Sequence, residues 1–459
     1  MRSGRLAYNR AFFPMSRTIV RDILRLGWPV FIAQIAIMAN GVIDTVMAGR
    51  YSTVDLAAVG IGASIYYSIF IALMGVLLAL TPIASQLYGA GRHAEIGEEV
   101  RQAVWLAAVL ALVCLFVLRY PDPFLAVSRL QPEVEAKTRA YLEAASWGVP
   151  GQLLFRVFYG FSTAVSRPRA VMALNIIGLA VKVPLNWVFM YGKLGMPELG
   201  GVGCAVASSV MVWVTCALGW LWCFVESDYR RYGIFARWSW PRAKNLWRQL
   251  SLGLPIGITF FVDVTGFTFM ALFIARLGPT NSAAHQIAAN FAAFLFMLPL
   301  ALGNASSVLV GQAIGSQDMA RARSTGLWGI GTALAIAVVV SAAVLLNSEG
   351  IASLYSVDAG VRQLAGRLLT LVAVYHLADS VQAVAVNVLR GYKRAVVPML
   401  VYAVALWGVG LGGGYLLGFA GIEGLAAPLG APGFWIASSA ALFLAGGLVT
   451  LYFLRVSRQ

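Results

Sequence analysis

Three aspartates lie deep inside long apolar stretches of the chain: Asp44, Asp263 and Asp379. A charged side chain at the centre of a bilayer costs about 2.5–3.5 kcal/mol on insertion scales, so such residues usually serve an ion pathway, a proton relay or a substrate site. Carboxylates in these positions can bind a proton, a metal cation or an organic cation. The sequence therefore points first to transport.

The surroundings of each aspartate refine this interpretation. Asp263 lies roughly midway along its apolar stretch, whereas Asp44 is close to Arg50, so solvation of Asp44 by lipid headgroups is an alternative to a functional role. Helical spacing places Tyr375, Asp379 and Gln382 on one face. These settings favour a functional role for Asp263 and Asp379.

Amide side chains within the apolar stretches form a second set of candidates. Gln286 and Asn290 share a helical face, and Asn186 lies in another stretch. Such amides either line a polar cavity or join helices by hydrogen bonds. We assign all three to substrate binding and keep helix packing as the alternative.

Sequence motifs of enzymes are missing from the chain. It contains no Walker loop, no HExxH zinc motif and no nucleophile elbow. We therefore predict a protein that is not an enzyme and that needs no cofactor. Without a nucleotide site, uphill transport must draw on an ion gradient.

The elements that hold these residues are predicted to be membrane-spanning helices. Hydrophobic residues make up 60% of the 459 residues and charged residues 12%, compared with about 25% in soluble domains. The net charge of +15 comes from basic residues at the ends of apolar runs, where lipid headgroups explain them better than nucleic acid does. The chain is predicted to be an all-α polytopic membrane protein.

Twelve segments are long and apolar enough to span a bilayer of about 30 Å. They lie near 25–49, 56–86, 102–120, 139–162, 169–191, 201–226, 249–276, 283–313, 324–346, 363–389, 396–418 and 432–455. We predict an N-terminal tail at 1–24, a six-helix lobe at 25–226, a cytoplasmic linker at 227–248 and a second lobe at 249–459. Lysines and arginines concentrate on the side of the tail and linker, which predicts that both termini are cytoplasmic.

An internal repeat relates the two predicted lobes. One constant offset pairs Leu24 with Leu250, Gly27 with Gly253, Pro29 with Pro255, Gln86 with Gln312 and Gly89 with Gly315. Because each half has an even number of spans, we expect a pseudo-twofold axis along the membrane normal and a cavity between the lobes.

Five stretches resemble the MATE (multidrug and toxic compound extrusion) transporters, and within them the NorM-type branch. They are VIDTVMAGRYSTVDLAAVGIG (42–62), LTPIASQLYGAGR (80–92), VPLNWVFMYGKLGMPELGGVGCAVAS (183–208), AAHQIAANFAAFLFMLPLALGNASSVLVGQAIG (283–315) and ADSVQAVAVNVLRGYKR (378–394). The resemblance implies two six-helix lobes that open outward in a V. It further implies export of cationic amphipathic drugs across a bacterial inner membrane in antiport with sodium or protons.

The resemblance also implies roles for single residues. The family's cation site, which would hold sodium or a proton, falls on Asp263 and Asp379, although the family usually has Glu at the first position. We therefore expect Asp263, Asp379 and the neighbouring Tyr375 to take part in cation coupling. Asp44, Gln286 and Phe296 match substrate-site positions, and Phe296 stands where some members have Tyr. Asp358 matches a substrate-contacting acid of some members.

The sequence predicts small cationic ligands and leaves two alternative functions open. We expect organic cations, a monovalent cation and membrane lipid as partners, no nucleic acid, and a monomeric protein. One alternative is a flippase for lipid-linked glycans, which would favour a basic cavity. Another is an integral-membrane enzyme that modifies lipids, which would need a catalytic cluster at the interface.

Overall fold

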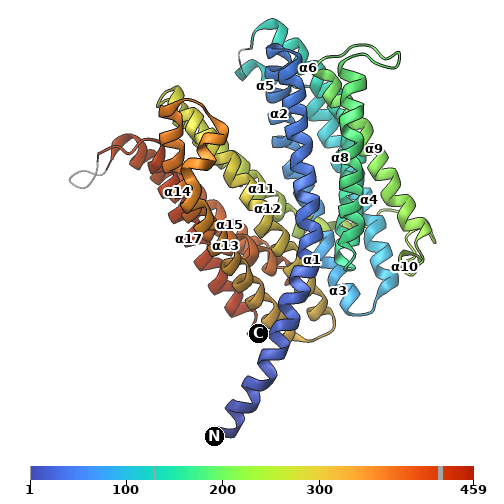
Figure 1. Ribbon diagram of the computed structural model, residues 1–459. Coiled ribbons are helices and arrows are strands. Elements are labelled where there is room, and N and C mark those ends of the chain that lie inside the picture. Colours follow the sequence, from blue (N-terminus) through green and yellow to red (C-terminus); the bar gives the residue numbers. More distant parts are fainter. Residues whose placement is uncertain (1, 129, 422–426, 459) are drawn as a thin grey trace. The chain divides into compact units, whose positions relative to one another are not determined.

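The computed structural model describes residues 2–128, 130–421 and 427–458, with helices and no strand among them (Figure 1). Of the predicted tail and C-terminal lobe, residues 1, 422–426 and 459 lie outside this described part. The chain divides into two compact units. The C-terminal unit comprises residues 1–31 and 258–459, and the N-terminal unit comprises residues 32–257. The predicted domain limits, which place the first span with the N-terminal lobe, stay a prediction.

Two long helices contribute to both units. They are α1 (Arg2–Tyr51), which passes from one unit to the other at residues 31–32, and α11 (Ala243–Ala275), which does so at residues 257–258. In the N-terminal unit the other helices are α2 (Thr53–Leu77), α3 (Leu80–Gly89), α4 (His93–Arg119), α5 (Asp122–Ser128), α6 (Pro132–Ser146), α7 (Val149–Ala164), α8 (Pro168–Met190), α9 (Val202–Val225) and α10 (Ser227–Arg230).

The C-terminal unit is organised around one buried helix, α14 (Ala359–Gly391). It packs against α12 (Pro279–Gly315), α13 (Met319–Tyr355) and α17 (Ala431–Val456). Its sequence alternates small and branched apolar residues around Asp379, which lets three neighbours approach closely. Asp379 is therefore held on a helix that three neighbouring helices enclose.

The helix before α17 is irregular. It consists of α15 (Val396–Val404), a π-helical stretch at Ala405–Gly412, α16 (Gly413–Tyr415) and a second π-helical stretch at Leu416–Ala420. A Cβ atom on Gly418 would lie 2.5 Å from Cε2 of Phe434, so the glycines of this segment allow close packing on α17. π-helical turns are frequent at functional sites, and this segment carries Tyr402 to the candidate site described below.

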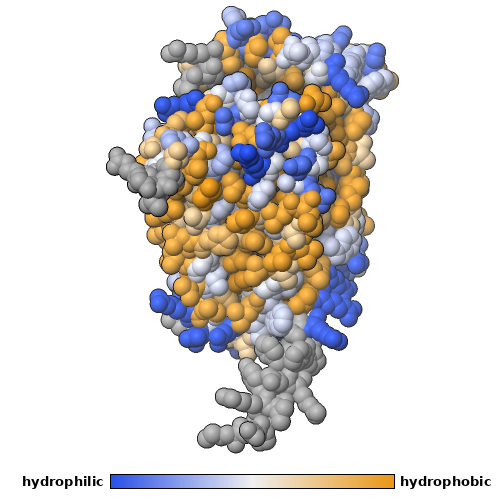
Figure 2. Space-filling view, turned by 60° about the vertical axis from the view of Figure 1, so that its left-hand side comes forward, coloured by the Kyte–Doolittle hydropathy of each residue, from blue (hydrophilic) through white to orange (hydrophobic). Residues whose placement is uncertain are grey.

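Eleven helices of the described part are long and apolar enough to cross a membrane. On the face shown in Figure 2, hydrophobic residues predominate in a broad central zone, and hydrophilic residues gather toward its two ends. In lipid, a spanning helix satisfies all its backbone hydrogen bonds internally. The prediction of an all-α polytopic membrane protein is confirmed.

The remaining predicted span, 139–162, is not one continuous helix. It falls on α6 and α7, which are separated at Trp147–Gly148 because Pro150 supplies no backbone N–H. Two side chains of α9 satisfy the freed carbonyl groups: Ser209 donates to Ala144 O at 2.8 Å, and Trp213 donates to Trp147 O at 2.9 Å. The sequence located this segment but missed its break.

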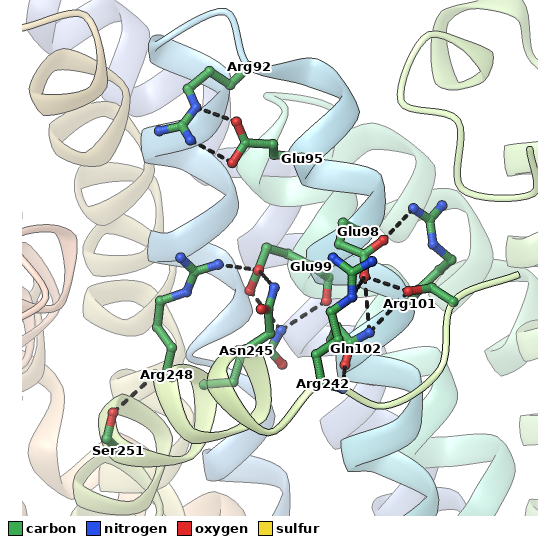
Figure 3. Close-up of polar contacts among 12 residues, drawn as sticks. Arg92, Glu95, Glu98, Glu99, Arg101, Gln102, Arg242, Asn245, Arg248 and Ser251 are labelled. Atoms are coloured by element: carbon green, nitrogen blue, oxygen red, sulfur yellow. Dashed lines mark hydrogen bonds and ion pairs between the residues drawn. The ribbon is translucent and has the colours of Figure 1, made fainter. Parts of the chain in front are cut away.

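The segment predicted as a linker packs against the first turns of α4 (Figure 3). A Cβ atom on Gly97 would lie only 2.0 Å from Tyr232 O, so only glycine permits this approach. Glu98 accepts hydrogen bonds from Arg101 at 2.8 Å and from Ser239 at 2.5 Å. The linker is thus fixed to the N-terminal unit.

A second buried carboxylate, Glu99, fixes the start of α11 to the same helix. It accepts hydrogen bonds from Asn245 at 2.6 Å and from Gln249 at 3.0 Å, and it pairs with Arg248 (Figure 3). The side chain of Glu99 is 1% exposed, so these donors compensate for its lost hydration. Residues 237–249 therefore belong physically to the N-terminal unit.

Candidate functional site

The C-terminal unit contains a cavity of about 350 Å³. It is bounded by α11, α12, α14 and α15, and we refer to it as the C-terminal cavity. Its size lies in the range of about 300–1,000 Å³ that is usual for sites of small organic molecules. The lining residues are Thr259, Phe260, Asp263, Val264, Phe267, Thr268, Ala289, Ala292, Ala293, Phe296, Met297, Leu300, Tyr375, Asp379, Gln382, Ala383, Val386, Asn387, Arg390 and Tyr402.

Asp263 enters the C-terminal cavity from the middle of α11. Its Oδ1 accepts a hydrogen bond of 2.5 Å from the phenolic hydroxyl of Tyr402 on α15. Tyr402 is buried, and a buried tyrosine hydroxyl usually needs such a partner. The bond fixes one carboxylate oxygen and leaves Asp263 only half-buried, facing the cavity.

Asp379 enters the same cavity from α14. It lies one turn after Tyr375 and one turn before Gln382, and all three side chains are buried and line the cavity. The predicted helical face is therefore confirmed. Tyr375 packs edge-on against Trp435 of α17, with ring centroids 5.5 Å apart. This contact and the close packing around α14 hold the face in place.

Neither carboxylate in the C-terminal cavity has a cationic partner. No described residue forms an ion pair with Asp263 or Asp379, and none donates a hydrogen bond to Asp379. An ionised carboxylate at such a depth is unfavourable without compensation. A bound cation or proton would supply the missing compensation.

One basic residue does line this cavity, and it was not expected there. Arg390 lies one residue beyond the predicted span 363–389, but the structure buries it in the last turn of α14. Its guanidinium donates to Asn387 Oδ1 at 3.2 Å and lies 5.4 Å from the ring centroid of Phe260. The cavity thus holds two carboxylates and one guanidinium, a net charge of −1 with all three ionised.

The other predicted site residues of this unit do not all lie at the C-terminal cavity. Phe296 lines the C-terminal cavity, whereas Gln286 and Asn290 lie on exposed positions of α12 and do not line it. Asp358 is exposed and caps α14, since its Oδ1 accepts a hydrogen bond of 2.8 Å from Val361 N. A capping role explains this aspartate without any ligand.

In the N-terminal unit, Asp44 is part of a buried polar cluster. Its Oδ1 lies 3.0 Å from Nζ of the fully buried Lys182 and accepts a hydrogen bond of 2.8 Å from Asn186. Lys182 also donates to Cys204 O at 3.0 Å and to Ser208. Headgroup solvation therefore does not describe the setting of Asp44, and Asn186 contacts Asp44 directly.

Sequence reasoning missed Tyr402 and Arg390 as lining residues. Tyr402 lies in an apolar run without another polar residue nearby, and only its hydroxyl group hinted that it needed a partner. Arg390 fell outside the predicted span 363–389, because sequence does not show where a helix ends to within one turn. No group of three or more His, Cys, Asp or Glu residues capable of holding a metal occurs in the described part.

The chain resembles known proteins along nearly its whole length. A family model described as MatE matches residues 29–188 and again residues 255–416, so its two matches begin at Pro29 and Pro255, which the internal repeat pairs. The probable multidrug resistance protein NorM of Aromatoleum aromaticum is 40% identical over 441 residues, covering 95% of each chain. The multidrug resistance protein NorM of Vibrio cholerae is 37% identical over 428 residues, covering 92% of this chain and 93% of the relative.

Solved structures agree at the level of the fold. The crystal structure of the eukaryotic MATE transporter AtDTX14 superposes with a TM-score of 0.87 at 18% identity over 96% of each chain. The Vibrio cholerae MATE transporter VcmN in its bent form gives a TM-score of 0.83 at 16% identity, covering 97% of this chain and 98% of VcmN. The resemblance seen in the sequence is confirmed: the chain belongs to the MatE family of transporters.

Proposed function

We propose that this protein is a secondary multidrug efflux transporter that exports cationic amphipathic compounds in antiport with sodium or protons. The observation that carries the proposal is the presence of Asp263 and Asp379 in one cavity without any cationic partner among the described residues. The names of the NorM relatives, which describe multidrug resistance proteins, support the same conclusion.

The coupling cation would bind between the two carboxylates. Asp263, Asp379 and the hydroxyl groups of Tyr375 and Tyr402 offer oxygen ligands, which hard cations such as sodium prefer. A proton would instead bind to one carboxylate. Either ion would remove the unfavourable charge from the cavity.

The exported compound would use the apolar walls of the same cavity. Phe260, Phe267, Phe296 and Met297 line it, and their aromatic and thioether groups suit amphipathic molecules of variable shape. An organic cation would then compete with the coupling ion for the carboxylates. Net exchange requires each ligand to favour a different conformation, because tight binding alone shifts no equilibrium.

The predicted location and orientation of the protein form part of the proposal. The excess of basic residues on the side of the N-terminal segment supports cytoplasmic termini in a bacterial inner membrane. Roles in substrate binding for Asp44, Asn186, Gln286, Asn290 and Asp358, and a monomeric state, stay predictions. The acidic C-terminal cavity speaks against a flippase for pyrophosphate-linked glycans, which would need a basic one.

Efflux from proteoliposomes tests this function. Purified protein reconstituted with a fluorescent organic cation inside should release the dye when an inward sodium gradient or an inward proton gradient is imposed, and the effective gradient identifies the coupling ion. Liposomes without protein provide the baseline. Release at the baseline rate under both gradients would refute the proposed antiport.

A further inference from the structure

A second cavity, of about 110 Å³, lies within the N-terminal unit, and we refer to it as the N-terminal cavity. Helices α1, α2, α6, α7, α8 and α9 all contribute to its wall, which is largely aromatic through Tyr66, Tyr67, Tyr141 and Phe155. Only two of its lining residues are charged: Asp44 and Arg156.

The negative charge in this cavity is already compensated. Lys182 Nζ and Asn186 Nδ2 contact the same oxygen of Asp44, at 3.0 and 2.8 Å. Lys182 is fully buried and has no other acid to pair with in the described part of the chain. Asp44 and Lys182 therefore form a neutral pair, and this cavity does not present a free carboxylate to an organic cation.

The positive charge of Arg156 has no such compensation. Its guanidinium lies 4.9 Å from the ring centroid of Tyr159, and no described residue forms an ion pair or a hydrogen bond with it. Arginine offers five N–H donors, and a face-on aromatic ring satisfies none of them. With Asp44 and Lys182 paired, the N-terminal cavity carries one excess positive charge.

A neighbouring side chain adds an unused polar group. The hydroxyl of Tyr159, which also lines this cavity, is buried and has no hydrogen-bond partner among the described residues. Tyr159 follows Arg156 by three residues on α7, so both side chains lie on the same side of that helix. A free guanidinium and a free hydroxyl thus share one cavity wall.

We propose that Arg156 and Tyr159 form an anion subsite that recognises substrates by their carboxylate group. A carboxylate accepts two parallel N–H bonds from a guanidinium, a geometry that gives both strength and selectivity. A cavity of 110 Å³ holds the carboxylate-bearing end of an aromatic compound rather than a whole drug. This inference rests on the proposed efflux function and specifies its substrates.

A matched pair of dyes tests the inference. A rhodamine with a free benzoate is zwitterionic, and its methyl ester is a cation of nearly the same shape. Binding of each dye to the purified protein is measured by fluorescence anisotropy without any gradient, for the wild type and for Arg156→Gln, Arg156→Lys, Tyr159→Phe and the exposed control Arg362→Gln.

We expect Arg156→Gln to weaken binding of the free benzoate dye by about 10- to 100-fold, the usual size of a lost charge-assisted contact. Arg156→Lys should weaken it less, Tyr159→Phe only a few-fold, and Arg362→Gln not at all. Binding of the ester should stay within twofold in every variant. In the wild type, added benzoate should displace the bound dye that carries a free benzoate group, whereas benzamide should not. This competition tests the subsite even if a variant fails to fold.

Two results would overturn the subsite: equal weakening of both dyes in Arg156→Gln, or equal displacement by benzoate and benzamide. Failure of the proposed efflux function would give another result. The ester dye would then bind to the wild type but would not be exported under either gradient.

Discussion

The hydroxyl of Tyr402 donates a hydrogen bond of 2.5 Å to Asp263, so the acid that departs from the family pattern has a dedicated donor on another helix. Aspartate reaches one methylene less far than the usual glutamate. In this chain the side chain of Asp263 on α11 meets the hydroxyl of Tyr402 on α15. Helix α15 directly precedes the π-helical stretch. The geometry of the proposed cation site therefore depends on both residues.

Replacing Tyr402 with Phe should weaken sodium binding. The change removes the hydroxyl that orients Asp263, and hydrogen bonds to charged groups contribute about 1.5–3 kcal/mol, or roughly tenfold or more in affinity. The measurement is the sodium concentration that gives half-maximal dye release. Tyr120→Phe, at an exposed tyrosine, should leave it unchanged. An unchanged ion dependence in Tyr402→Phe would remove Tyr402 from the site.

Replacing Lys182 with Met should destabilise the protein. Asp44 would remain buried without its cation, and removal of one partner of a buried ion pair costs about 3–5 kcal/mol. Adding Asp44→Asn should recover much of this loss, because the double variant leaves no unpaired charge. Thermal unfolding in detergent measures both effects, with the exposed Lys193→Met as control. Additive losses in the double variant would show that the two residues are not coupled.

Replacing Glu99 with Gln should loosen the attachment of the linker. Glu99 is buried and pairs with Arg248, so loss of its charge should cost about 1–3 kcal/mol. Glu95→Gln breaks the exposed pair with Arg92 and should cost at most about 1 kcal/mol. Thermal midpoints in detergent compare the two variants. Equal midpoints would contradict a structural role of the buried pair.

Replacing Gly97 with Ala should displace the same segment by steric conflict. The new methyl group would meet Tyr232 O at 2.0 Å, and overpacking of this kind costs about 1–3 kcal/mol. We expect faster proteolysis within residues 230–242. Gly350→Ala, where the methyl group would meet nothing within 4 Å, should match the wild type. Unchanged proteolysis in Gly97→Ala would contradict the close approach.

The sequence predicted the helical class, the position of nearly every span and the shared face of Tyr375, Asp379 and Gln382. These features depend on local apolar periodicity, which a single sequence displays directly. It did not predict the break at Trp147–Gly148, because carbonyl groups freed there are satisfied by Ser209 and Trp213 from another helix.

Pairings between distant helices were equally inaccessible. The sequence showed Asp44 and Lys182 as separate charges, and only the packing of α1 against α8 and α9 makes them a pair. It also showed Arg156 and Arg390 as basic residues without indicating which would have a partner. Because Lys182 compensates Asp44, the remaining charge of the N-terminal cavity is the positive one of Arg156.

The central claim is that the carboxylates of the C-terminal cavity couple efflux to an ion gradient. Gradient-driven release of a cationic dye from proteoliposomes, measured for the wild type, Asp263→Asn, Asp379→Asn and the exposed control Asp122→Asn, tests it most directly. We predict release at the rate of protein-free liposomes for Asp379→Asn, a strong reduction for Asp263→Asn, and the wild-type rate for the control. Release at the wild-type rate by correctly inserted Asp379→Asn protein would contradict the account.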